Sequence, residues 1–128
     1  MDNLVSIIIP CYNGEKYIDQ SIRSVWEQDY PRMELIVIDD GSVDQSRVKI
    51  LAWQKAFQDR GLVLKYLYQE NQGPGAATNY GLKHVTGKYL TLLDADDVYL
   101  PGAIRKKAEF LDAHPDYAGV RNNGWRVS

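Results

Sequence analysis

The amino-acid sequence predicts an α/β fold in which a mostly parallel sheet carries helices on both faces. Short β-branched or apolar runs, the pattern of strands buried on both sides, recur four times along the chain. A helical period follows each run, and this alternation implies parallel strands joined by crossover helices. The 128 residues contain no repeat, linker or low-complexity tract, so we expect one domain, 1–128.

The first predicted strand runs from Val5 to Ile9 and ends at Pro10. A helix is expected from Lys16, because apolar side chains then recur at helical spacing. These side chains are Ile18, Ile22, Val25 and Trp26. The second strand, Leu35 to Ile38, leads directly into the sequence Asp-Asp-Gly-Ser at positions 39–42.

The second predicted helix uses Ser42 as its N-cap and ends at Gly61. The residues expected to share one face of it are Val48, Leu51, Ala52 and Lys55. A third strand is predicted over Val63 to Tyr68. The loop Asn71 to Gly75 follows, rich in glycine and proline.

A short third helix is predicted from Ala76 to Val85, with Gly87 as its C-terminal stop. Tyr89 to Leu93 is the fourth predicted strand. Pro101 suits the first turn of a last helix, and its apolar face comprises Ile104, Ala108 and Leu111. Residues Val120 to Val127 are expected to begin a fifth strand.

Composition excludes several classes of protein. The formal net charge of −2 argues against broad nucleic-acid binding, which needs a concentrated basic surface. Cys11 is the only cysteine, so an internal disulfide is impossible. The N-terminus lacks the basic region of a signal peptide, and the apolar runs fall far short of the ~20 residues that span a bilayer. We therefore expect a cytoplasmic chain without a transmembrane segment.

Acidic side chains follow two of the predicted strands. Asp94, Asp96 and Asp97 come directly after the fourth strand, where their carboxylates could hold Mg²⁺ or Mn²⁺ against substrate phosphates. Asp39 and Asp40 follow the second strand and could accept hydrogen bonds from a base or ribose. For the loop 39–42, an Asx turn that caps a helix explains the same residues equally well.

Two other classes of protein place polar groups at strand ends. A phospho-accepting receiver would need a lysine at a later strand end, and Val120 to Val127 contains none. A nicotinamide-dependent oxidoreductase would use a glycine-rich turn, and Gly73-Pro74-Gly75 only approaches that fingerprint. These two alternatives and a nucleotide or metal site remain open from spacing alone.

Four sequence blocks resemble the inverting family 2 glycosyltransferases of the GT-A, Rossmann-like fold. They are VSIIIPCYNG at 5–14, ELIVIDDGSVD at 34–44, GPGAATN at 73–79 and GKYLTLLDADD at 87–97. The blocks occur in the family's order and cover nearly the whole chain. The resemblance implies binding of a nucleotide-diphosphate sugar, UDP-linked, together with Mg²⁺ or Mn²⁺.

The resemblance also assigns roles to individual residues. The residues it implies around the base and ribose are Pro10, Tyr12, Asn13, Asp39 and Asp40. It implies that Asp94 and Ala95 face the ribose or sugar, and that Asp96 of the Asp-x-Asp motif binds the metal. Thr78 stands where many members carry arginine, and Val43 where threonine is common.

Family members continue for about as long again. The resemblance therefore implies that the acceptor site and the catalytic Asp or Glu base lie beyond Ser128. We expect this chain to be the donor-binding half of an enzyme of polysaccharide biosynthesis that transfers sugar, with inversion, to a glycan or lipid-linked acceptor. The donor sugar, the acceptor and any peripheral membrane attachment of the longer protein stay open.

Overall fold

A computed structural model describes residues 2–115, and their core is a four-stranded sheet. The strands are β1 (Val5–Cys11), β2 (Met33–Asp40), β3 (Val63–Gln69) and β4 (Tyr89–Leu92). All neighbours pair in parallel, in the order β3-β2-β1-β4. The predicted parallel sheet is thus confirmed, and its four strands coincide with the four apolar runs.

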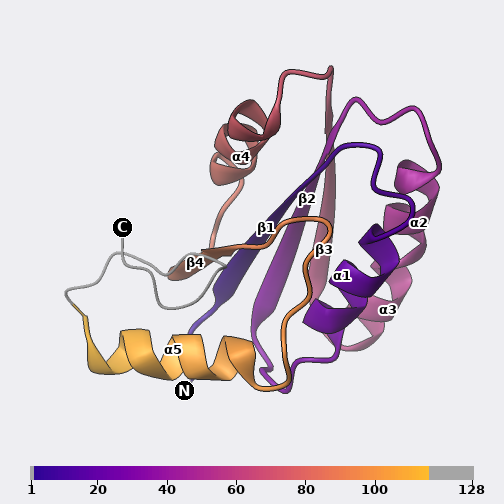
Figure 1. The fold of residues 1–128 in the computed structure, drawn as a ribbon. Coiled ribbons are helices and arrows are strands. Elements are labelled where there is room, and N and C mark those ends of the chain that lie inside the picture. Colours follow the sequence, from indigo (N-terminus) through magenta and orange to yellow (C-terminus); the bar gives the residue numbers. More distant parts are fainter. Residues whose placement is uncertain (1, 116–128) are drawn as a thin grey trace.

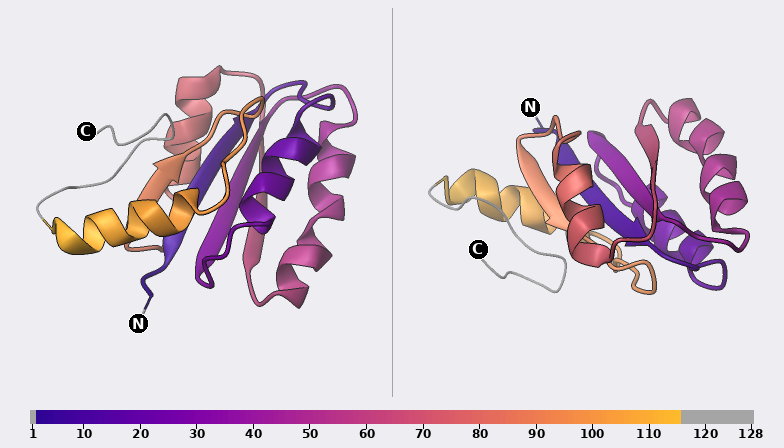
Figure 2. Two further views of the ribbon diagram at one scale, coloured as in Figure 1. Left: turned by 60° about the horizontal axis from the view of Figure 1, so that its bottom comes forward. Right: turned by 90° about the horizontal axis from the view of Figure 1, so that it is seen from above.

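Helices cover both faces of this sheet (Figure 1). One face packs against α1 (Ile18–Trp26), α2 (Ser46–Ala52), α3 (Gln54–Asp59) and α5 (Ala103–Ala113). The other face packs against α4 (Pro74–Leu82). Figure 2 shows α4 separated from α1, α2 and α3 by the sheet.

Strand alternation explains why the central strands are continuously apolar. Ile7 and Ile9 join the larger core cluster under α1 and α5, whereas Ile8 joins the smaller cluster under α4. Successive side chains of a strand point to opposite faces, so a strand covered on both sides needs apolar residues at consecutive positions. All three isoleucines are fully buried.

The second predicted helix differs from the structure. It begins at Ser46 rather than after Ser42, and it is divided into α2 and α3 at Trp53. The Trp53 amide bonds the Ile50 carbonyl at 3.1 Å, a three-residue step that tightens the turn. The predicted face is also wrong, because Val48 is 62% exposed and the buried side chains are instead Ser46, Ile50 and Phe57.

Two further boundaries shift. Helix α4 ends at Leu82, so Gly87 is not its stop. A Cβ at Gly87 would lie 2.5 Å from Ser6 Oγ and 2.8 Å from the Leu4 carbonyl, so close approach to β1 requires this glycine. Helix α5 begins at Ala103, two residues after Pro101, with Gly102 in the left-handed conformation as its N-cap.

The predicted strand at Val120 to Val127 lies outside the described residues. Among residues 2–115, no helix is long and apolar enough to cross a bilayer.

Candidate functional site

The candidate site lies at the carboxyl edge of the sheet, the edge at which open α/β folds bind ligands. The loops after β1, β2 and β3 meet at the top of Figure 1. The predicted site residues all fall at this edge, either in the last residues of a strand or in the loop that follows it. They are Pro10, Tyr12, Asn13, Asp39, Asp40, Asp94, Ala95 and Asp96.

Hydrogen bonds join the loop after β1 to the loop after β2. The Asn13 amide donates to Ser42 Oγ at 2.9 Å, and the Val43 amide donates to Asn13 Oδ1 at 2.9 Å. The Gly14 amide donates to Ser46 Oγ, also at 2.9 Å. Ser42 was expected to cap a helix, but its hydroxyl instead supports the neighbouring loop.

Asp39 is a buried carboxylate on the α2 side of the sheet. Only 1% of it is exposed. Its Oδ1 accepts the Ser42 amide at 2.9 Å, and its Oδ2 accepts the hydroxyl of Tyr66 at 2.6 Å. Burial, followed by the hydrogen bond to Asp39, raises the pKa of Tyr66 well above its ordinary value, so the phenol stays a donor.

Asp40 serves the loop between β3 and α4. Its Oδ1 accepts Gln69 Nε2 and the Gln72 amide, both at 2.8 Å. Its Oδ2 accepts the Gly73 amide at 3.0 Å and Asn71 Nδ2 at 3.2 Å. Burial alone would raise the pKa of Asp40, but these hydrogen bonds outweigh it and the pKa lies below its ordinary value.

Gly41 allows the loop between β3 and α4 to approach the end of β2 closely. Its φ is +75°, and a Cβ there would lie 2.7 Å from the Asn71 backbone nitrogen. The glycine therefore admits a neighbouring segment of the chain. The Gln72 and Gly73 amides, just before and at the start of α4, both donate to Asp40.

Three carboxylates gather after β4. One oxygen from each of Asp94, Asp96 and Asp97 lies within 4.8 Å of the others, and all three residues are exposed. Burial, followed by the charges of Asp96 and Asp94, raises the pKa of Asp97. Oxygen donors crowded in this way match the ligands that Mg²⁺ and Mn²⁺ prefer, and a divalent cation would relieve their repulsion.

The turn that carries these acids is fixed to the rest of the edge. Ser21 of α1 donates its hydroxyl to the Asp97 carbonyl at 2.5 Å. A Cβ at Gly14 would lie 3.8 Å from the Cβ of Ala95, so the loops after β1 and β4 touch. Tyr12, in the first of these loops, is 54% exposed. The loop that carries Tyr12 and the turn that carries the acidic cluster thus lie side by side at this edge.

Cys11 has no part in this chemistry. It is 1% exposed, and burial raises its pKa to about 11. A thiol of that pKa stays protonated at neutral pH, so Cys11 is a packed core residue.

Sequence reasoning missed the residues that hold the acids. Tyr66, Gln69 and Asn71 donate to Asp39 or Asp40 from β3 and the loop after it. The positions of these three residues in the sequence form no motif, because their contacts depend on β3 lying beside β2. Strand pairing was the missing information.

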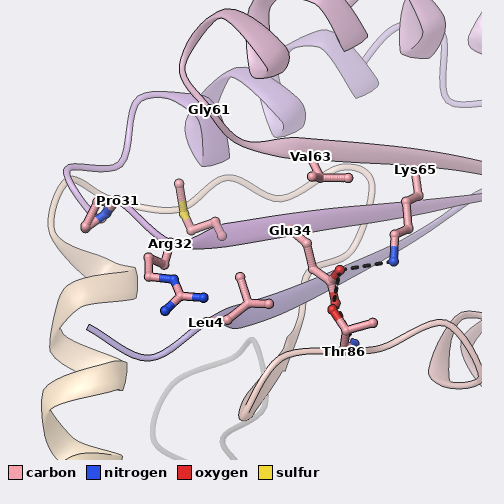
Figure 3. Close-up of a pocket in the computed structure, with 9 residues that line it drawn as sticks. Leu4, Pro31, Arg32, Glu34, Gly61, Val63, Lys65 and Thr86 are labelled. Carbon is pink, nitrogen blue, oxygen red and sulfur yellow. Dashed lines mark hydrogen bonds and ion pairs between the residues drawn. The ribbon is translucent and has the colours of Figure 1, made fainter. Parts of the chain in front are cut away.

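Two hollows lie away from the acidic cluster. One, of about 340 Å³, opens at the amino edge of the sheet beside Glu34 and Lys65 (Figure 3). The other, of about 360 Å³, lies between the end of β3 and α4, and both Gln69 and Gln72 contribute to it. Part of the lining of this second hollow therefore belongs to the loop whose residues donate to Asp40.

A family model described as glycosyl transferase family 2 matches residues 6–124. The chain belongs to glycosyl transferase family 2. This membership was predicted from the four sequence blocks and is confirmed. It favours neither a receiver nor a nicotinamide-dependent enzyme.

Curated relatives are similar in sequence but longer. An uncharacterized glycosyltransferase of Rickettsia conorii is 40% identical over 109 residues, which is 85% of this chain and 17% of the relative. One of Haemophilus influenzae is 41% identical over 108 residues, which is 84% of this chain and 42% of the relative. The chain therefore spans less than half the length of either protein.

Solved structures show the same fold. TarS of S. aureus (its 1–349 fragment) has a TM-score of 0.76 and 34% identity over 88% of this chain and 33% of its own. The same fragment has been solved with UDP-GlcNAc. The mannosyltransferase PcManGT of Pyrobaculum calidifontis, in complex with GDP-Man and Mn²⁺, has a TM-score of 0.77 and 29% identity, covering 87% of this chain and 33% of its own. The predicted GT-A class is thereby confirmed.

Proposed function

We propose that residues 1–128 form the donor-binding unit of a glycosyltransferase and bind a UDP-linked sugar together with Mg²⁺ or Mn²⁺. The observation that carries the proposal is the acidic cluster, Asp94, Asp96 and Asp97, beside the loop of Tyr12. A nucleotide sugar needs a cation for its diphosphate and an aromatic or polar surface for its base. The donors bound by TarS and PcManGT belong to the same class of ligand and support this assignment.

The base side of the donor is assigned to the loops after β1 and β2. The half-exposed ring of Tyr12 offers a face for stacking, with Pro10 and Asn13 on either side of it in the sequence. Asp40 accepts two backbone and two side-chain donors. A base N–H can replace a side-chain amide there while both backbone bonds persist. Asp39 is assigned to the same side of the donor but lies on the opposite face of β2, where it accepts the Ser42 amide.

The diphosphate side is assigned to the turn after β4. Asp96 would hold the cation, while Asp94 and Ala95 would face the ribose or sugar. A cation bound there would supply Lewis-acid stabilisation of the departing diphosphate. The carboxylates of this chain supply the charge and the hard oxygen ligands that retain it.

Sugar transfer itself is assigned to the longer protein. There an acceptor hydroxyl of a glycan or lipid-linked molecule, deprotonated by a carboxylate, attacks the anomeric carbon with inversion. We assign that base and the acceptor site to sequence outside residues 1–128. The greater length of the relatives supports this division.

Calorimetric titration with three nucleotides tests the proposal. UDP, GDP and NAD are each titrated into the chain with Mn²⁺ and with a chelator. We expect UDP to bind most tightly, to lose affinity in chelator, and NAD not to bind. Equal UDP affinity in both conditions would refute the metal assignment, and a preference for GDP would refute the uracil assignment. Binding of NAD alone would refute the donor class.

A further inference from the structure

A chain of hydrogen bonds runs from β3 to the loop after β1, across the end of β2. Tyr66 donates to Asp39, and the same carboxylate accepts the Ser42 amide at 2.9 Å. The Ser42 hydroxyl accepts the Asn13 amide, also at 2.9 Å. Four residues on three successive βα units are thus linked through two buried or half-buried acceptors.

The Tyr66 end of this chain is rigid. The carboxylate of Asp39 is almost fully buried, and the Tyr66 hydroxyl approaches it to 2.6 Å. The guanidinium of Arg47, in α2, lies 6.0 Å from the centre of the Tyr66 ring, a distance at which a cation and a ring attract each other. The Tyr66 hydroxyl is the donor in this bond, because a carboxylate oxygen accepts.

The Asn13 end is conformationally demanding. Asn13 has a φ of +49°, and it is the only residue other than glycine with a positive φ in the described part of the chain. This left-handed conformation is uncommon for residues other than glycine, although asparagine tolerates it best, and two hydrogen bonds hold it here. The contacts are the Asn13 amide on Ser42 Oγ and the Val43 amide on Asn13 Oδ1.

Asn13 directly follows Tyr12, whose ring is assigned to the base. The backbone angles of Asn13 set where the chain turns after Tyr12, and so fix the direction from which that ring meets a ligand. Any loosening of Ser42 would release Asn13 and let Tyr12 move.

We propose that Tyr66 is a positioning residue for nucleobase recognition, acting through Asp39, Ser42 and Asn13 on the orientation of Tyr12. Tyr66 itself touches no part of the donor. Asp39 acts in the same way, by holding Ser42, whereas Asp40 on the other face of β2 is the acid assigned to the base, in exchange for one of its side-chain donors. This inference rests on the proposed function, because it presupposes a base at Tyr12.

Tyr66→Phe removes only the hydroxyl that donates to Asp39. The Tyr66–Asp39 hydrogen bond is present with and without the donor, so its energy, about fivefold in an equilibrium constant, is an upper limit on the effect of its loss on binding. We expect uridine and UDP each to bind more weakly, by up to about fivefold. The ratio of UDP affinities with and without Mn²⁺ should stay unchanged, because the acidic cluster lies on a different loop.

Tyr68→Phe is the matched control. Tyr68 lies two positions along the same strand, is 54% exposed and belongs to no step of the proposed chain. We expect it to bind uridine as the unmodified chain does. Urea denaturation of both variants separates a loss of stability from a loss of binding. A destabilised Tyr66→Phe variant with unchanged uridine affinity would overturn the proposal.

A double-mutant cycle provides a readout that a structural role would not move. Ser42→Ala removes the acceptor of the Asn13 amide, and we expect it to weaken uridine binding as Tyr66→Phe does. If Tyr66 and Ser42 act through one chain of hydrogen bonds, the double variant should bind uridine no more weakly than the single variant that has the lower affinity. Additive losses would overturn the chain, and Ser42→Ala alone still tests it if Tyr66→Phe does not fold.

The outcomes for the unmodified chain distinguish the two proposals. If that chain binds neither uridine nor UDP, the proposed function fails and this inference fails with it. If it binds both, and both tyrosine variants bind uridine equally well, the positioning role of Tyr66 alone is refuted.

Discussion

Glu34 of β2 and Lys65 of β3 form an ion pair of 3.1 Å at the amino edge of the sheet. Glu34 is 3% exposed, and it also accepts the Ser6 hydroxyl at 2.5 Å and the Thr86 amide at 2.7 Å. Figure 3 shows the Lys65 and Thr86 contacts converging on the one carboxylate. The network ties β1, β2, β3 and the segment before β4 together, far from the acidic cluster.

Glu34→Gln should destabilise the fold, because it removes the charge on which these donors converge. We expect the free energy of unfolding to fall by about 2–3 kcal/mol, as for hydrogen bonds to a buried charged group. Asp59→Asn is the control, since its pair with Lys55 is exposed and should change stability by less than about 0.5 kcal/mol. Urea titration measures both, and equal effects would contradict the role of the network.

The stability of the chain should fall as the solution becomes acidic. Burial alone would raise the pKa of Glu34, but hydrogen bonds from Ser6, Thr86 and Lys65 hold it below its ordinary value of 4.5. Because the folded-state pKa is the lower one, this stabilisation is complete above pH 4.5 and is lost as pH falls through the folded-state value.

Urea midpoints measured from pH 7 to pH 3 check this dependence. The Glu34→Gln variant lacks this titration, so its midpoint should decline less steeply below pH 4.5. Parallel declines for the two proteins would contradict the pKa direction.

Gly87→Ala should be strongly destabilising although it adds only one methyl group. That methyl would meet Ser6 Oγ and the Leu4 backbone within 2.8 Å, and the backbone can yield only by distorting β1. We expect a loss of about 2–3 kcal/mol.

Gly75→Ala is the matched control for Gly87→Ala. Gly75 lies in α4 with nothing within 4 Å of its added Cβ, so alanine should stabilise by about 0.5–1 kcal/mol. Thermal unfolding distinguishes the two variants, and a neutral Gly87→Ala would contradict the close approach to β1.

Asp96→Asn should weaken Mn²⁺-assisted binding of UDP by more than Asp97→Asn does. Both changes remove one charge from the acidic cluster, but only Asp96 is assigned as the metal ligand. Calorimetry with UDP, with and without Mn²⁺, gives the two ratios. Equal losses would show that Asp96 has no special part in holding the cation.

Asp40→Asn should weaken the binding of uridine, for which no metal is needed. Its amide would turn a donor towards the Gln72 or Gly73 amide. Hydrogen bonds to a charged group are worth about 1.5–3 kcal/mol, so we expect at least about a tenfold loss. Circular dichroism confirms folding, and unchanged uridine affinity in a folded variant would reduce Asp40 to an anchor of the β3–α4 loop.

The sequence determined the fold class and the family. Runs such as 35–38, apolar at every position and rich in β-branched residues, indicated strands covered on both faces, and the intervening helical periods implied the parallel pairing that the sheet has. The same reasoning brought Asp94, Asp96 and Asp97 to the carboxyl edge of the sheet, because residues that follow a strand must emerge there. These are local properties, readable from spacing and motif.

Tertiary structure decided what each polar residue does at that edge. Asp39 and Asp40 look equivalent in sequence, yet one meets Tyr66 and the other meets the loop at 69–73. Strand alternation predicts that the two diverge, but only the sheet order β3-β2-β1-β4 supplies their partners. Ser42 and Gly87 were assigned to helix ends for the same reason: local sequence cannot report a contact with a strand that is distant in the chain.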